Sequence, residues 1–207
     1  MTTPRTARGR ATRQRILDAA TALISERGIA GTSLDDIRDM AQASKSQLYL
    51  YFPDRETLLR EVAASTCDSV IDAQADTLGA FDSIDGIRRY LDATVALQVE
   101  RDQPSGCPIA SLAGQLADHD ERSRLILADG LDRWEAGLRR GLEAMAERGE
   151  LETGTDPATL ATQSLALLQG GLLLAQVRRD ATQLRVAADA VLALISASLR
   201  AGVGTHD

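Results

Sequence analysis

Metal, disulfide and redox chemistry find little support in this sequence, because the residues they need are scarce. Two cysteines, two histidines and one tryptophan stand among 207 residues. Cys67 and Cys107 are too few for a disulfide framework, and no cysteine or histidine pair has the spacing of a metal site. We therefore predict no metal and no cofactor, and we expect Cys67 to be a buried small apolar residue.

Long apolar runs and catalytic motifs are missing as well. No apolar stretch approaches the ~18–20 residues of a membrane span, and the basic segment "MTTPRTARGRATRQR" lacks the apolar part of a secretory signal. His119, in the charged segment "ADHDERSR", has no evident serine or cysteine partner, and no glycine-rich phosphate loop is present. We therefore expect a cytoplasmic protein that is not an enzyme and does not contact membranes.

Positive charge comes almost entirely from arginine and is concentrated near the N-terminus. Lys45 is the only lysine among 23 basic residues. Residues 1–60 contain ten basic and seven acidic side chains, a net charge of +3, so the rest of the chain carries −10 to give the total of −7. We call residues 1–60 the head and the remaining residues the body. A basic head and an acidic body predict two functions in one chain, and only the head suits binding to a polyanion.

The apolar pattern predicts an all-α protein of about nine helices, the fourth of which should run unbroken from residue 55 toward Gly79. We expect two domains, residues 1–60 with a basic N-terminal arm and residues 61–207. The expected inward-facing residues are Ile16, Ala20, Leu23, Ile24, Leu34, Ile37, Met40, Leu48 and Phe52 in the first domain, and Leu127, Leu131, Trp134, Leu138, Leu142 and Met145 in the second.

The segment "SKSQLYLYF" has the chemistry of a helix that reads DNA. Two short helices joined by a tight turn and braced by a longer one form a helix-turn-helix, and the second short helix here begins at Ser44. Ser44 as N-cap and Gln47 three residues later form a capping-box pattern. Three aromatic side chains and the lone lysine gather in and beside this helix.

Each polar residue of this helix suits a contact with a duplex. Gln47 can present a paired donor and acceptor to a base, while Lys45 suits a phosphate. The same expectation extends to Ser44, Ser46, Tyr49, Tyr51 and, at the start of the next helix, Arg55. A polar first turn with two tyrosines is also common on soluble proteins, so the chemistry alone leaves DNA contact and a solvated helix both open.

The order of elements resembles the TetR family of tetracycline-repressor-like regulators. The resemblance rests on "RILDAATALISERGIAGTSLDDIRDMA", "SKSQLYLYF" and "PDRETLL", and extends from Arg13 to about Leu59. It adds Thr32 and Ser33, at the start of the second helix, to the candidate DNA contacts. The sequence departs from the family pattern in two places: Gln42 replaces the usual turn glycine, which predicts a different turn or a strained left-handed residue, and Ser46 replaces a glycine that often follows the lysine.

The resemblance implies a DNA-binding head and a ligand-sensing body that works as a homodimer on a near-palindromic operator, paired through the last two helices. Ligand binding would change the separation of the heads and release the DNA. The sequence offers "LALLQGGLLLA", with Gly170 and Gly171, and an apolar stripe on the final helix formed by Leu184, Ala188, Val191, Ile195 and Leu199. Burial of both helices within one subunit is the alternative.

The N-terminal arm carries Arg5, Arg8, Arg10 and Arg13. These arginines could follow a phosphate backbone or enter a minor groove, or they could belong to a solubilising tail. We expect phosphate contacts from Arg10 and Arg13.

The composition of the C-terminal body, which is rich in leucine, alanine and valine, predicts a site for an apolar or amphipathic small molecule. Tyr90, Cys107, Trp134 and Gln169 are the candidate ligand-binding residues. Trp134 could equally be a core residue, and Gln169 would be a polar anchor. Cys107 opens a helix in "SGCPIASLAGQLAD", where a thiol is more reactive, so pocket wall, electrophile or oxidant sensor, and inert packing all stay open for it.

The resulting prediction is a ligand-responsive transcriptional repressor whose partners are a double-stranded DNA operator, a small-molecule effector and a second copy of the chain. The alternatives are a redox- or electrophile-sensing regulator acting through Cys107, and an activator. A ligand-binding protein without DNA activity would leave the head unexplained, and a DNA-bending protein without a ligand would leave the body unexplained.

Overall fold

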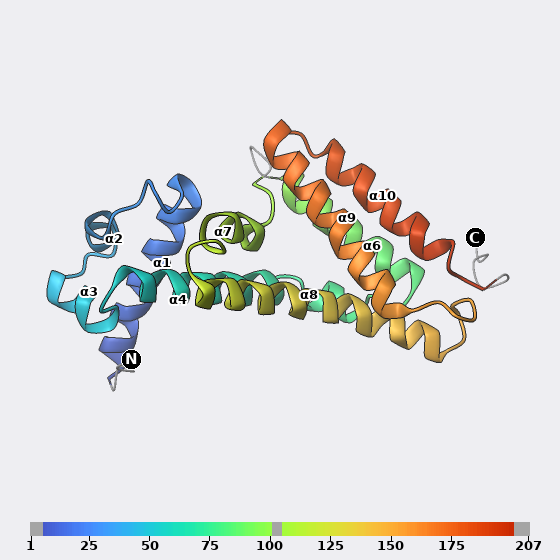
Figure 1. The fold of residues 1–207 in the computed structure, drawn as a ribbon, viewed down its shortest axis with the longest axis horizontal. Helices are drawn as coiled ribbons and strands as arrows, with labels where there is room; N and C mark the ends of the chain where they lie inside the picture. The colour runs from blue at the N-terminus through green and yellow to red at the C-terminus, as the bar shows by residue number, and fades with distance from the viewer. Residues whose placement is uncertain (1–5, 101–104, 201–207) are drawn as a thin grey trace. The chain divides into compact units, whose positions relative to one another are not determined.

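The structure is a computed structural model that describes residues 6–100 and 105–200. This part of the chain forms helices and no strand, with one isolated bridge between Leu151 and Leu199. The expected all-α class is therefore confirmed (Figure 1). The helices are α1 (Ala7–Arg27), α2 (Leu34–Met40), α3 (Lys45–Tyr51), α4 (Arg55–Asp72), α5 (Ala75–Gly79), α6 (Ile84–Val99), α7 (Pro108–Leu116), α8 (Glu121–Glu147), α9 (Pro157–Arg178) and α10 (Thr182–Ser196).

One more helix is present in the described residues than the sequence predicted, because the fourth expected helix is broken between Asp72 and Ala75. At the break the Gln74 side chain turns back to donate to the Val70 carbonyl at 2.8 Å. The side-chain Oε1 of Gln74 accepts a hydrogen bond from the Tyr90 hydroxyl at 2.9 Å. A tertiary contact thus ends a helix that local propensity would have continued.

The described residues divide into two compact units, residues 6–69 with 112–128, and residues 70–100, 105–111 and 129–200. This division differs from the boundary expected at residue 60. The core of the first unit continues along α4 through Val62 and Cys67, both almost fully buried. Two pairs tie the second segment of this unit to its first, because the Ile29 N–H donates to Gln115 at 2.8 Å and Arg60 pairs with Asp120.

The helix ends of the N-terminal unit are fixed by capping residues close to them in the sequence. Gly28 ends α1 with φ +72°, and Ser33 and Asp36 form a capping box on α2. Asp54 accepts a hydrogen bond from the Thr57 N–H at 2.6 Å at the start of α4. These caps keep the connections between α1, α2 and α3 short, so that the two short helices α2 and α3 pack against the longer α1.

The inward-facing residues of this unit are largely as expected, with one error. Leu48 and Phe52 are each 2 % exposed, and the four expected residues of α1 are buried. Met40, expected inside, is 55 % exposed. Ile37 and Ala41, one full helical turn apart, share the buried face of α2, and Met40 is rotated away from that face.

The C-terminal unit contains α9 and α10 packed side by side, with α10 also against α6 (Figure 1). A Cβ on Gly171 would stand 2.6 Å from the Ala187 Cβ, so this glycine permits close approach within the chain. The expected dimer stripe of α10 is buried in the same chain, since Leu184, Ala188, Val191 and Ile195 are at most 3 % exposed. The prediction that this stripe meets a partner subunit was therefore wrong.

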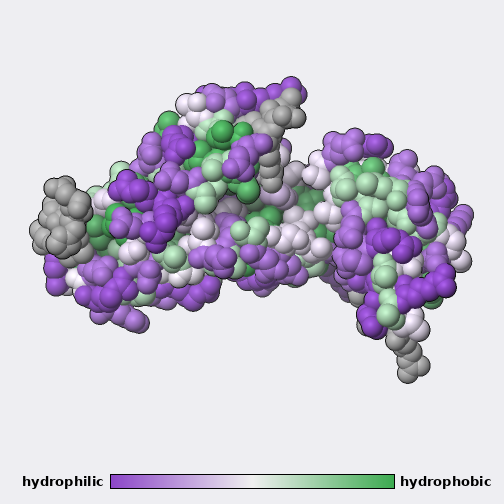
Figure 2. All heavy atoms as spheres, turned by 180° about the vertical axis from the view of Figure 1, so that it is seen from behind, coloured by the Kyte–Doolittle hydropathy of each residue, from purple (hydrophilic) through white to green (hydrophobic). Residues whose placement is uncertain are grey.

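A different apolar surface remains exposed on these two helices. Gly170 has open space around it, whereas Gly171 does not. Figure 2 shows green apolar atoms gathered between purple ones on one face of the C-terminal unit. The exposed large apolar residues of α9 and α10 are Leu167, Leu173, Leu174, Val177 and Val186.

Among the described residues, α9 is the single helix long and apolar enough to cross a membrane by length and composition. A core helix of a soluble protein passes the same test. Here α9 is packed along α10, and Leu160, Leu168 and Leu172 are buried. Packing within the chain therefore explains part of the apolar composition of α9, and the exposed residues named above make up the rest.

The Arg60–Asp120 pair makes the stability of the N-terminal unit depend on pH. Hydrogen bonds from Arg60, at 2.8 and 2.9 Å, and from Ser123 hold the pKa of Asp120 well below its usual range. A lowered carboxyl pKa stabilises the folded state above the ordinary value of ~3.9, and this stabilisation is lost as the pH falls through the folded pKa.

We expect Asp120→Asn to lower the urea midpoint near pH 7, with the difference from wild type shrinking as the pH falls below about 4. Urea unfolding at several pH values measures this. Asp118→Asn, at an exposed carboxylate two residues earlier, is the control and should follow wild type throughout. A difference that stayed constant down to strongly acidic pH would contradict the ion-pair explanation.

Candidate functional site

Helix α3 begins with the predicted capping box. The Ser44 hydroxyl accepts the Gln47 N–H at 3.2 Å, and the Gln47 carbonyl oxygen accepts the Ser44 N–H at 2.9 Å. The Ser44 and Ser46 hydroxyls are also hydrogen-bonded to each other, at 2.9 Å. The first turn of α3 is therefore held in place before any ligand arrives.

The turn that leads into α3 contains a left-handed residue. Gln42, which replaces the family's glycine, has φ +50°, so the strained alternative of the two predicted outcomes is the one observed. The turn is held from both sides, since Ala43 N–H donates to the Arg38 carbonyl at 3.0 Å and Arg15 Nε donates to the Ala41 carbonyl at 3.3 Å. These bonds fix the angle between α2 and α3.

The outward face of α3 carries the side chains suited to a duplex. Lys45 and Ser46 are exposed, and Tyr49 is 44 % exposed, whereas Leu48 on the opposite face is 2 % exposed. Tyr51 is half-buried at the end of the helix. The Gln47 carbonyl oxygen is already engaged in the cap, so paired donor-and-acceptor reading of a base by Gln47 would require the capping box to open.

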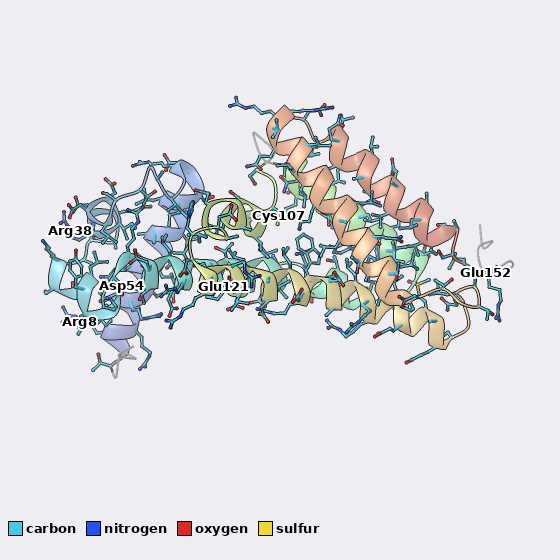
Figure 3. The ribbon with its side chains drawn as sticks, viewed as in Figure 1. Arg8, Arg38, Asp54, Cys107, Glu121 and Glu152 are labelled. Carbon is cyan, nitrogen blue, oxygen red and sulfur yellow. The ribbon has the colours of Figure 1, made fainter. Side chains whose placement is uncertain are left out.

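The arm arginines lie in two different environments. Arg10 is exposed on the first turns of α1, as is Arg8, which Figure 3 labels. Arg13 instead pairs with Glu61 at 2.9 Å and lies over the Phe52 ring, 5.2 Å from its centroid. Arg13 therefore braces the end of α3 against α4. Arg5 lies outside the described residues.

Three other candidate DNA contacts serve the structure of the head. Thr32 is 3 % exposed, and its hydroxyl donates to the Gly28 carbonyl at 2.9 Å. Arg55 donates to the carbonyls of Ile29 and Thr32 at 2.5 and 2.9 Å, which fastens the α1–α2 loop to α4. Ser33 is exposed but occupied in capping. The structure thus brings Lys45, Ser46, Tyr49 and Gln47 together outward, and gives Thr32 and Arg55 internal partners.

Helix α2 places acidic charge close to the head's surface. Hydrogen bonds from the Ser33 hydroxyl and N–H hold the pKa of Asp36 below its usual range. Arg38 is paired with Asp35 and Asp39, and its hydrogen bond to Asp39 raises the pKa of the Arg38 guanidinium (Figure 3). Arg38 is therefore neutralised locally, whereas the Lys45 side chain projects from an exposed position on α3.

The C-terminal unit contains a buried chain of polar aromatic residues. Trp134 Nε1 donates to the Tyr90 hydroxyl at 2.7 Å, and this hydroxyl donates to the side-chain Oε1 of Gln74 at 2.9 Å. The Phe81 ring meets the Tyr90 ring edge-on, with centroids 5.2 Å apart. Burial raises the pKa of Tyr90, so its hydroxyl stays neutral and able to donate.

Cys107 and Gln169 form a second buried contact in this unit. Gln169 Nε2 lies 3.5 Å from the Cys107 sulfur, which is at the start of α7 and 5 % exposed (Figure 3). Cys107 also acts electrostatically on Tyr90, as a minor contribution to its raised pKa. The structure therefore joins the four predicted ligand-binding residues in two buried pairs of the C-terminal unit, Tyr90 with Trp134 and Cys107 with Gln169.

Sequence reasoning missed several residues that position these groups. Gln98, 4 % exposed, donates to the Gly106 carbonyl at 3.3 Å and accepts the Ser105 N–H at 3.0 Å, which fixes the residues before Cys107. Three other side chains also form hydrogen bonds that fix neighbouring segments: Gln74 bonds to Tyr90, Arg15 to the Ala41 carbonyl and Gln115 to the Ile29 N–H. Glutamine and arginine have no sequence periodicity that marks such bonds. Residues 6–100 and 105–200 contain no group of three or more metal-ligating side chains.

Comparisons with known proteins agree with this architecture. A model described as "Bacterial regulatory proteins, tetR family" matches residues 16–62, and one described as "Tetracyclin repressor-like, C-terminal domain" matches residues 83–191. The chain therefore belongs to the TetR family of DNA-binding transcriptional regulators, as the sequence predicted.

Individual relatives extend over most of the chain. It is 30 % identical over 179 residues to an HTH-type transcriptional regulator of Mycobacterium tuberculosis, covering 83 % of this chain and 88 % of the relative. It is 23 % identical over 168 residues to the HTH-type transcriptional repressor DhaR of Mycobacterium sp. strain GP1, covering 81 % and 84 %. A TetR-family crystal structure from Mesorhizobium loti has the same fold, with a TM-score of 0.78, 24 % identity and coverage of 94 % and 100 %.

Arg55 gives a test of structural against DNA-contacting roles. Arg55→Lys keeps the charge, but its ammonium ends one bond short of the position of Nη2, the nitrogen that donates to both carbonyls. We expect it to lower the free energy of unfolding of the N-terminal unit by about 1–2 kcal/mol, measured by urea unfolding. Arg8→Lys, at an exposed position on α1, is the matched control. Unchanged stability with weakened DNA binding would instead assign Arg55 to the DNA surface.

Proposed function

We propose that this TetR-family regulator is a repressor that binds a near-palindromic operator as a homodimer and is released by a small apolar or amphipathic effector. The observation that carries the DNA half is the two-faced α3, with Lys45 and Ser46 outward and Leu48 and Phe52 buried. A short helix held in this way can enter the major groove with its N-terminal residues at the base edges.

The contacts within the groove follow from the surroundings of each side chain. Lys45 and Arg10 are exposed positive charges that bind phosphates, and Tyr49 lies on the same outward face of α3 as Lys45. Gln47 offers its amide nitrogen to a base while its oxygen keeps the capping box closed. Arg13, over the Phe52 ring, and Arg55, bonded to the α1–α2 loop, stabilise the position of α3.

Dimerisation uses the outer face of α9 and α10 rather than the buried stripe of α10. The exposed apolar residues Leu167, Leu173, Leu174, Val177 and Val186, with Gly170 open between them, form a surface that a second copy would cover. Two helices from each subunit would then form a four-helix interface. A two-fold dimer presents two copies of α3 to two half-sites.

The effector site comprises Tyr90, Cys107, Trp134 and Gln169. Three of them are at most 5 % exposed, so the site is mainly apolar with few polar groups, which suits an amphipathic molecule better than a sugar or nucleotide. Repression rather than activation is supported by the relative that is named a transcriptional repressor. We further propose a cytoplasmic location and no catalytic activity.

A second candidate function is the sensing of electrophiles or oxidants through Cys107. The observation in its favour is the position of the Cys107 sulfur at the start of α7, where it accepts a hydrogen bond from the Gln169 amide. Modification of a 5 % exposed thiol would also disturb the packing around α7.

Lys45→Ala tests the proposed docking. Binding to operator fragments from around the protein's own gene should weaken on every sequence, and the salt slope should fall by about 0.9, because one phosphate contact is lost. Gel shifts at several salt concentrations measure both. Arg139→Ala removes one positive charge on α8 and should change neither.

Gln47→Ala should alter base preference instead, and unchanged binding by both α3 variants would contradict the docking.

Cys107→Ser tests the second candidate function. If the thiol is a sensor, N-ethylmaleimide should release wild type and Cys67→Ser from operator DNA but leave Cys107→Ser bound, because only the last lacks the reacting sulfur. Gel shifts with and without the reagent measure this. Equal release of Cys107→Ser would discard the sensing function and leave Cys107 as a wall or packing residue.

A further inference from the structure

One half of the Gln169 amide has a hydrogen-bond partner and the other half does not. Nε2 donates to the Cys107 sulfur at 3.5 Å, while the buried Oε1 accepts no hydrogen bond from the described residues. Rotating the amide by 180° would place Oε1 against the thiol and leave Nε2 unpaired instead. A buried amide that is only half satisfied costs stability, and such groups in native proteins usually have a functional explanation.

The other polar groups of the same site are already paired. The Tyr90 hydroxyl both donates, to Gln74, and accepts, from Trp134, and the Trp134 N–H has no further hydrogen to give. The Cys107 sulfur accepts from Gln169. In the amide orientation of this structure, Oε1 of Gln169 is therefore the side-chain oxygen of these four residues without a hydrogen-bond partner, and a donor on an incoming molecule can pair with it without first breaking a hydrogen bond.

We propose that Gln169 is the specificity-determining residue of the effector site and selects a neutral, mainly apolar molecule that carries a hydrogen-bond donor, such as a hydroxyl or an N–H group. This inference rests on the proposed effector function of the site. None of Tyr90, Cys107, Trp134 and Gln169 is positively charged, so a carboxylate would lose its hydration without gaining a counter-charge from them. Ethers and ketones would leave Oε1 unpaired.

The test uses pairs of compounds that differ only in the donor: 1-naphthol with 1-methoxynaphthalene, 1-octanol with 1-methoxyoctane, and indole with N-methylindole. Trp134 is the only tryptophan of the chain, so its fluorescence reports binding of the octanol pair. Thermal shift measures binding of all three pairs, because the naphthalene and indole compounds fluoresce themselves. We expect the full-length protein to bind the donor member of a pair at least about tenfold more tightly than the methylated member.

Gln169→Met replaces the amide by an unbranched apolar side chain of similar length. It should remove the preference, so that both members of a pair bind equally. Gln163→Met, at an exposed position on the same helix, is the matched control and should keep the preference. Without any compound, Gln169→Met should melt at a higher temperature than wild type, because the unpaired carbonyl is gone.

The possible outcomes separate this inference from the function on which it rests. Binding without a donor preference, a preference retained by Gln169→Met, or a lower melting temperature of the free variant would each overturn the role of Gln169 and leave the regulator intact. If no compound changed Trp134 fluorescence, melting or operator binding up to its solubility limit, the amphipathic-effector proposal and this inference would both fall.

Discussion

The structure depends first on the burial of Leu48 and Phe52 beneath a helix of seven residues. A helix this short is unstable in isolation, since nucleation costs more than two turns of hydrogen bonds return. It persists because the Ser44 cap satisfies its first turn, while the Arg13 guanidinium covers the Phe52 ring. Because the apolar side is fixed, the polar side faces solvent in a defined orientation, and the identity of its residues can vary without loss of the fold.

In the C-terminal unit, several buried polar side chains are hydrogen-bonded to one another, and the Oε1 of Gln169 is an exception without a partner. Gln74, Tyr90 and Trp134 form a continuous hydrogen-bonded chain, and Gln98 holds the segment before Cys107. In a low-dielectric interior, a satisfied network of this kind fixes the positions of its members, and an unsatisfied member is costly. The orientation of α3 thus depends mainly on an apolar anchor, whereas the orientation of Tyr90 and Trp134 depends on buried hydrogen bonds.

Features set by local sequence were predictable, and features set by distant contacts were not. The Ser44 capping box, the Gly28 helix end and the inward face of α3 follow from neighbouring residues, and the family pattern identified the head. Nothing local revealed that Gln74 interrupts a helix to reach Tyr90, or that Arg55 turns inward to two carbonyls. The partner of an apolar stripe is equally invisible in sequence, which is why the buried face of α10 was assigned to another subunit. The four candidate ligand-binding residues came from composition and resemblance, but their pairing required coordinates.

The scarcity of lysine has a chemical consequence. Lys45, exposed at the first position of α3, provides the only side-chain amine of the chain. Acylating reagents, which spare guanidinium groups at neutral pH, would therefore attach to this helix and, apart from the chain's α-amino group, nowhere else. A fluorophore or crosslinker could thus be placed on the exposed face of α3 without engineering, and its attachment would itself remove the charge at that position.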